Sequence, residues 1–116
     1  MESEVTRSLS LSPTKVLVAD SDEIVLALLS HILHRQGYSV DVAATADEAA
    51  NHLTQRDYRA IIIDVKLIGV VERFPERLSR TIVLSPKEQA DPRVHAVIQK
   101  PVEFGFLVDT VAGCVK

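Results

Sequence analysis

Four polar side chains stand at or just beyond the ends of short apolar runs of the chain. They are Asp20, Asp64, Ser85 and Lys100. If Asp20 and Asp64 lie side by side, their negative charges repel each other and require a cation between them. Lys100 can supply that charge, so these types of residue predict a small charged site built from two carboxylates and one ammonium group.

Each of these residues also has an ordinary structural explanation. An Asp or Ser that follows a strand commonly caps the next helix, because its side chain accepts a hydrogen bond from an unpaired backbone N–H. We therefore expect Asp22 or Ser21 to cap a helix that begins near residue 22. Because polar residues recur at the ends of four predicted strands, the pattern favours one shared functional site over four unrelated helix caps.

The apolar runs that precede these residues predict strands. Lys15–Ala19 and Ala60–Ile63 are almost continuously apolar, which is typical of parallel strands covered on both faces. Thr81–Leu84 and His95–Ile98 are two further candidates. Ser39–Ala43 alternates apolar and polar residues, which is typical of a strand nearer the edge of a sheet.

Helical patterns lie between the strands. Apolar residues recur at helical spacing over residues 22–36, 45–55 and 104–115, and Thr45 with Glu48 forms a capping box for the second of these segments. Strands that alternate with helices predict an α/β fold with a parallel sheet and helices on both faces. Ligands of such sheets bind at the carboxyl ends of the strands, where the four polar residues are expected.

Two connections are too short for ordinary crossover helices. Residues 65–80 barely exceed the about 10–12 residues that a crossover requires, so a single short turn is expected at Pro75–Leu78. Residues 86–94 include two prolines and leave no room for a normal helix. Apolar surface is then expected to lie open on one flank, which is the candidate interaction surface. The side chains available to cover this flank are Ile68, Val70, Val71 and Phe74.

Composition excludes several classes of protein. With 116 residues, of which 47% are hydrophobic and 25% charged, the chain is expected to form one globular domain over residues 14–116, preceded by a loose tail, Met1–Pro13. No apolar run approaches the roughly 18 residues of a membrane span, and no secretory signal is recognisable, so a cytoplasmic location is expected. The single Cys114 cannot form an internal disulfide, and a net charge of −3 argues against nucleic acid as a partner.

Taken together, the motifs KVLVADSDE, DYRAIIID, TIVLS and QKP resemble the receiver domain of bacterial two-component response regulators. The resemblance covers about residues 15–115. It implies a flavodoxin-like, doubly wound, five-stranded parallel sheet of order 2-1-3-4-5, here with the third and fourth helices shortened or missing. It also implies a histidine kinase or another signalling protein as partner.

The resemblance assigns a role to each residue of the predicted site. Asp64 would attack a phosphohistidine or a small phosphodonor and become an aspartyl phosphate. Asp20 and Ser21 occupy the positions that bind Mg²⁺ in the family. Ser85 would donate a hydrogen bond to the phosphoryl group, and Lys100 would pair with it across a Lys100-Pro101 bond that is characteristically cis.

Two departures from the family pattern weaken this assignment. Ser21 replaces a carboxylate that binds the metal, so only weak Mg²⁺ binding is expected, through Asp20, Asp64 and, to a small extent, Asp22. Val97 stands where the family has an aromatic switch residue.

Three functions therefore remain open. The preferred one is a degenerate receiver, a pseudo-receiver that works as a protein-interaction module with weak or no phosphotransfer. The second is a functional phosphoacceptor that a histidine kinase phosphorylates on Asp64. The third is a small flavodoxin-like protein that binds a nucleotide or another cofactor, against which stands the lack of a glycine-rich phosphate loop. No enzymatic activity beyond self-phosphorylation is expected.

Overall fold

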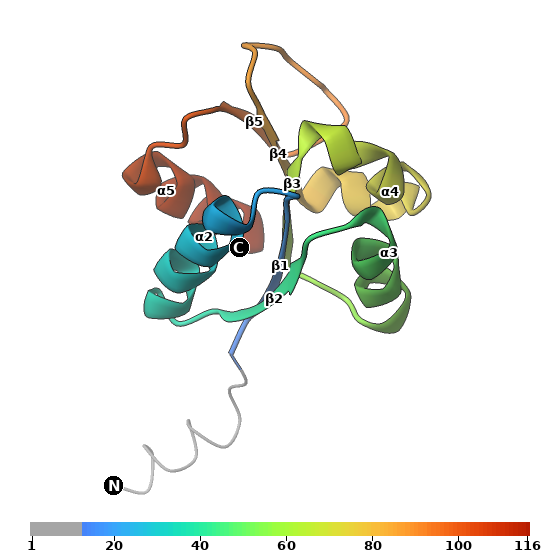
Figure 1. Cartoon of the computed structure of the whole chain (residues 1–116), viewed down its shortest axis with the longest axis horizontal. Coiled ribbons are helices and arrows are strands. Elements are labelled where there is room, and N and C mark those ends of the chain that lie inside the picture. The colour runs from blue at the N-terminus through green and yellow to red at the C-terminus, as the bar shows by residue number, and fades with distance from the viewer. Residues whose placement is uncertain (1–12) are drawn as a thin grey trace, which may run out of the picture.

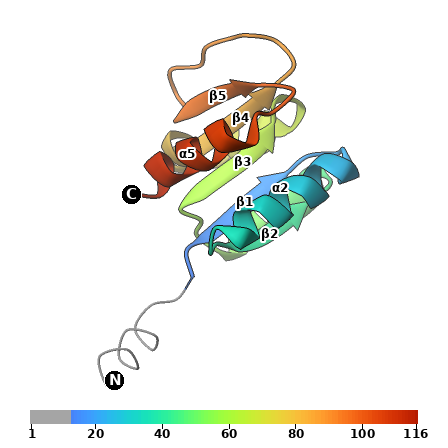
Figure 2. The same ribbon diagram turned by 90° about the vertical axis from the view of Figure 1, so that its left-hand side faces the viewer.

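The computed structural model describes residues 13–116 and contains one sheet of five parallel strands. The strands are β1 (Lys15–Ala19), β2 (Ser39–Ala43), β3 (Ala60–Asp64), β4 (Thr81–Ser85) and β5 (Ala96–Gln99). Their order across the sheet is β2-β1-β3-β4-β5, which confirms the predicted fold class (Figure 2). Apart from Pro13, the expected N-terminal tail lies outside the described residues.

Helices cover both faces of the sheet (Figure 1). One face carries α2 (Glu23–Arg35) and α5 (Phe104–Val115), and the other carries α3 (Ala46–Gln55) and the short α4 (Ile68–Glu72). Two 3-10 helices, η1 (Val65–Leu67) and η2 (Pro75–Arg80), flank α4. Within residues 13–116, no helix has the length and apolar character needed to cross a membrane.

Local signals in the sequence account for the helix ends. The Asp22 carboxylate accepts hydrogen bonds from the N–H groups of Ile24 and Val25, which confirms it as the cap of α2. Thr45 caps α3 by accepting from the N–H of Glu48. In a standard capping box the Glu48 carboxylate would accept from the N–H of Thr45. Here it accepts from the N–H of Ala44, the residue before the cap.

The two short connections contain no full-length helix, as predicted. Residues 65–80 form three short pieces, and η2 extends the expected turn at Pro75–Leu78 to Arg80. Residues 86–94 contain no helix or strand and form the wide loop at the top of Figure 1. The crossover between β4 and β5 is therefore made without a helix.

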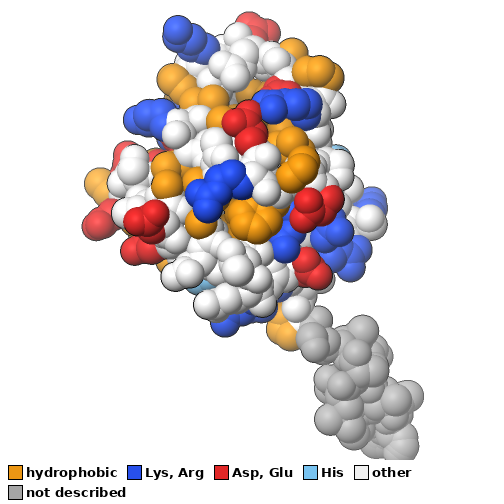
Figure 3. All heavy atoms as spheres, turned by 90° about the vertical axis from the view of Figure 1, so that its right-hand side faces the viewer, with side chains coloured by type: hydrophobic (Ala, Val, Ile, Leu, Met, Phe, Trp, Pro, Cys, Tyr) orange, Lys and Arg blue, Asp and Glu red, His pale blue; other side chains and the backbone are white. Residues whose placement is uncertain are grey.

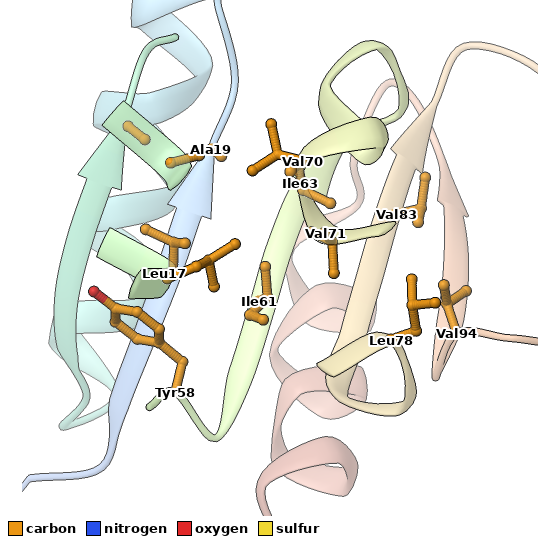
Figure 4. Close-up of a cluster of buried hydrophobic side chains, with 13 residues drawn as sticks. Leu17, Ala19, Tyr58, Ile61, Ile63, Val70, Val71, Leu78, Val83 and Val94 are labelled. Carbon is orange, nitrogen blue, oxygen red and sulfur yellow. The ribbon is translucent and has the colours of Figure 1, made fainter. Parts of the chain in front are cut away.

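The prediction that the two short connections, residues 65–80 and 86–94, leave an open apolar flank is wrong, because neither segment contains a large exposed hydrophobic side chain. Val70 and Val71 are 5% and 0% exposed, and in Figure 4 their side chains lie among those of strands β3 and β4. Ile68 and Phe74 pack against the same cluster. Figure 3 shows the hydrophobic side chains of this flank scattered between charged ones. The short pieces lie close enough to the sheet to bury their apolar side chains, so a complete helix is unnecessary.

The large exposed hydrophobic side chains belong to other elements instead. Those of residues 13–116 are Ile24, Leu28, Val42, Phe104 and Phe106, on α2, β2 and α5. The candidate interaction surface on the flank of residues 65–80 and 86–94 therefore has no support in the structure.

Val71→Ala should lower the free energy of unfolding by about 2 kcal/mol, because it leaves a cavity under α4. Val42→Ala is the matched control, since Val42 is 43% exposed and its loss should change stability by less than about 0.5 kcal/mol. Urea denaturation of both variants gives the comparison. Equal losses would mean that α4 does not cover the sheet as described.

Candidate functional site

The ammonium group of Lys100 lies between two buried carboxylates. Its Nζ is 2.9 Å from Asp20 Oδ2 and 2.7 Å from Asp64 Oδ1. Asp20 follows β1 and Asp64 ends β3, and these strands are neighbours with Ala19 paired to Ile63. The predicted juxtaposition is therefore present at the carboxyl edge of the sheet.

Each carboxylate has a second hydrogen-bond partner that fixes its orientation. Asp20 Oδ1 accepts from the N–H of Asp22 at 2.9 Å, and Asp64 Oδ2 accepts from the N–H of Lys66 at 3.0 Å. Both aspartates are 1% exposed. With all four oxygens engaged, the pair is held in one geometry rather than free to move in solvent.

The carboxylates also determine the charge state of Lys100. Partial burial alone would lower its pKa, but the hydrogen bonds and charges of Asp64 and Asp20 outweigh this effect and raise the pKa above its ordinary value. The ammonium form therefore persists at neutral pH. With both carboxylates ionised, the two negative charges and one positive charge leave a net charge of one negative unit.

The backbone around Lys100 directs the side chain to this place. The Lys100 N–H donates to the carbonyl oxygen of Ser85 at 2.7 Å, which ties the end of β5 to the end of β4. The Lys100-Pro101 peptide bond is cis, as predicted from the resemblance. The side chain reaches across β4 to the carboxylates on the far side.

Ser85 lies buried at the end of β4, but its hydroxyl faces the loop that follows. The hydroxyl donates to Gln89 Oε1 at 3.2 Å and accepts from the N–H of Lys87 at 3.2 Å. No hydrogen bond within residues 13–116 joins it to Asp64 or to the Lys100 ammonium group. The contact between Gln89 and Ser85 could not be predicted from the sequence, because the conformation of an irregular loop leaves no periodic pattern in it.

The structure does not bring a third carboxylate to the pair. Asp22 is exposed and its carboxylate caps α2, while Ser21 is also exposed. Among the described residues, no group of three or more His, Cys, Asp and Glu side chains gathers as a metal site. The Asp22 carboxylate therefore makes no contact in the described structure that supports its predicted minor role in metal binding.

The donor set of the site fits Mg²⁺ only loosely. Mg²⁺ prefers oxygen ligands and commonly keeps several waters, so Asp20 and Asp64 together are a sufficient but minimal pair. An oxygen of each already bonds to Lys100. A bound Mg²⁺ would have to compete with the ammonium group for these oxygens, which favours weak binding.

No protein-family model matches the sequence. The sensory/regulatory protein RpfC of Xanthomonas campestris pv. campestris is 28% identical to the chain over 118 residues, in the sequences of two strains. The similarity covers 84% of this chain and 16% of RpfC. The chain thus spans about 16% of the length of the curated relatives that it matches.

Solved structures of receiver domains share the fold. A CheY-like response regulator receiver domain protein of Methanospirillum hungatei superposes with a TM-score of 0.80 at 23% identity, over 90% of this chain and 94% of that chain. Chemotaxis response regulator CheY4 of Vibrio cholerae gives 0.76 at 20% identity, over 89% and 99%. Response regulator TrrA of Thermotoga maritima, solved in complex with Mg²⁺-BeF, gives 0.73 at 19% identity, over 87% and 98%.

Lys100→Met should lower the free energy of unfolding by about 3 kcal/mol, because it leaves two buried carboxylates without a counter-charge. Lys87→Met is the control, since Lys87 is exposed and its side chain makes no ion pair in the described part of the chain. Added Mg²⁺ should stabilise Lys100→Met more than the wild-type protein, because the competing ammonium group is gone. Unchanged stability of Lys100→Met in urea denaturation would contradict the ion pair.

Proposed function

We propose that this chain, which has the fold of response regulator receiver domains, is a degenerate receiver of two-component signalling. In this proposal it is a protein-interaction module whose Asp64 accepts a phosphoryl group only weakly. The exposed, neutral Ser21 beside Asp20, with the Asp22 carboxylate engaged as the cap of α2, is the observation that carries the proposal. No catalysis beyond self-phosphorylation of Asp64 is part of it.

Asp64 is the nucleophile in this function. One of its carboxylate oxygens forms the new bond to phosphorus, while the bond from phosphorus to the donor breaks and the donor leaves with that electron pair. The Lys100 ammonium group, 2.7 Å from Asp64 Oδ1, is placed to offset the charge of the phosphoryl oxygens. Mg²⁺, held by Asp20 and Asp64, would supply further positive charge for the transfer.

Three features of the site support weak rather than efficient transfer. Ser21 contributes no charge, and the Asp22 carboxylate is engaged as the cap of α2. Lys100 competes for the carboxylate oxygens that Mg²⁺ would need. The Ser85 hydroxyl is engaged by Gln89.

The proposed partner is a histidine kinase or another signalling protein, in the cytoplasm. The similarity to RpfC, a sensory/regulatory protein, supports this class of partner. An efficient phosphoacceptor is the second candidate, favoured by the intact contact between Lys100 and Asp64. The likeness to receiver structures argues against the third reading, a nucleotide- or cofactor-binding protein.

Incubation with Mg²⁺ and acetyl phosphate, followed by intact-mass and peptide analysis, tests the proposal. Wild-type protein should gain phosphate slowly and partially on Asp64, and Asp64→Asn should gain none because it lacks the nucleophile. Rapid, complete labelling of Asp64 would favour the efficient phosphoacceptor. Absence of any label on Asp64 would contradict the phosphotransfer part of the proposal. Binding of a signalling partner by Asp64→Asn with wild-type affinity would support a protein-interaction module that works without phosphorylation.

Ser21→Asp should tighten Mg²⁺ binding by about tenfold, because it restores a carboxylate beside Asp20. Ser79→Asp is the charge-matched control, on the exposed surface of η2 at the opposite end of β4 from the site. Isothermal titration of both variants with MgCl₂ measures the difference. If both variants bind like the wild-type protein, the neutral Ser21 is not what limits the metal.

A further inference from the structure

Strand β2 forms one edge of the sheet, and its outer side carries backbone groups that face away from β1 (Figure 2). The N–H of Ser39 and the carbonyl oxygen of Ala43 are hydrogen-bonded to the residues that flank β1. The direction of the peptide groups alternates along a strand. The N–H and C=O groups of Val40 and Val42 therefore point outward from the sheet.

Helix α3 covers only the C-terminal part of this edge. The Val42 carbonyl oxygen lies 3.0 Å from His52 Nε2, and the Ala44 N–H donates to Glu48 Oε1 at 2.7 Å. Within residues 13–116, no hydrogen-bond partner faces the Val40 N–H, the Val40 carbonyl oxygen or the Val42 N–H. Unpaired groups of this kind at a sheet edge are a template for another strand.

The uncovered part of the edge also has space and apolar side chains beside it. A hollow of about 380 Å³ adjoins β2 and is lined by Tyr38, Val40 and Pro13, among other residues. Val42 faces α2 across a second hollow, and its side chain is 43% exposed. The edge therefore offers both backbone groups and apolar side chains to an additional strand.

The free backbone groups of β2 match those of a second β2 that runs antiparallel to it, with Val40 opposite Val40. In this register each Val40 N–H donates to the Val40 carbonyl oxygen of the other copy, and each Val42 N–H donates to the Tyr38 carbonyl oxygen. The register leaves over the Tyr38 N–H and the Val42 carbonyl oxygen. Both are already satisfied within their own chain, by the Leu33 carbonyl oxygen and by His52.

The side chains are complementary in the same register. The exposed Val42 comes to lie opposite Tyr38 of the second copy, and pairs of β-branched and aromatic side chains stabilise antiparallel strands. On the other face of the sheet Asp41 comes to lie opposite Ser39, whose hydroxyl is 3.1 Å from Lys15 Nζ. The Lys15 ammonium group of each copy is thus placed beside the Asp41 carboxylate of the other. A register centred on Asp41 would instead set two carboxylates directly opposite each other.

We propose that two copies of the chain form a two-fold symmetric dimer by antiparallel pairing of their β2 edges, centred on Val40. The pairing joins the two sheets into one continuous sheet. Because β2 has only five residues, the contact is small, and the amount of dimer depends on protein concentration. Dimer formation does not require phosphorylation of Asp64.

Sedimentation velocity of the full chain over a range of concentrations tests the proposal. The wild-type protein should shift from the monomer mass toward twice that mass as the concentration rises. Ser39→Asp should weaken association by about threefold to tenfold, because it sets like charges opposite Asp41 twice in each dimer. In the monomer the new carboxylate lies beside Lys15 of its own chain, so the fold is kept. Ser39→Asn, which has the same shape without the charge, is the matched control and should associate like the wild-type protein.

An engineered disulfide tests the register, in a Cys114→Ala background that removes the native thiol. The Cα atoms of a hydrogen-bonded antiparallel pair are about 5.5 Å apart, which a disulfide can span. Val40→Cys should therefore cross-link two copies on mild oxidation. Val42→Cys is the control, because this position lies opposite Tyr38 and the two new thiols of the dimer are out of reach of each other.

Three results would overturn the proposal. The first is a wild-type protein that stays monomeric at every concentration, and slow amide exchange of Val40 and Val42 in that monomer would show that the edge is covered from within the chain. The second is equal association by Ser39→Asp and Ser39→Asn. The third is equal cross-linking of Val40→Cys and Val42→Cys, which would assign the dimer contact to another surface.

Discussion

The positive charge of Lys100 is the constraint on which the carboxyl edge of the sheet depends. Parallel pairing of β1 with β3 places Asp20 and Asp64 together, and both are 1% exposed. Two carboxylates in such a place repel each other and lose their hydration, so they require a cation. Pairing of β5 with β4 brings that cation from the far end of the chain. Four of the five strands thus have to be in register before the charges are balanced.

The sheet tolerates two short crossovers. A crossover needs only to return the chain to the start of the next strand and to cover apolar side chains. Residues 65–80 do both with α4 and two 3-10 helices, which bury Val71 and Leu78. The loop over residues 86–94 covers less and buries Val94. In place of a helix, this crossover is a loop that bonds to the Ser85 hydroxyl through the Lys87 N–H and the Gln89 side chain.

The elements of the fold could be predicted from the sequence because their signals are local. Lys15–Ala19 and Ser39–Ala43 are strands with the predicted bounds, and Asp22 caps its helix as expected. The meeting of Asp20, Asp64 and Lys100 also followed, because parallel strands share one carboxyl edge. The burial of Val70 and Val71 did not follow, because it depends on how closely α4 approaches the sheet. The orientation of the Ser85 hydroxyl likewise depends on a loop conformation that no periodicity encodes.

The pKa of the Lys100 ammonium group tests the account most directly, by NMR titration of its Cε signal. The account predicts a pKa above that of an ordinary lysine, because the bonds to Asp64 and Asp20 outweigh the partial burial of the group. Since the folded-state pKa is raised, the stabilisation by this ion pair is fully present below the pKa of the unfolded chain and is lost as the pH rises through the folded-state value. A Lys100 pKa equal to or below the ordinary value of a lysine side chain would contradict the ion-paired site.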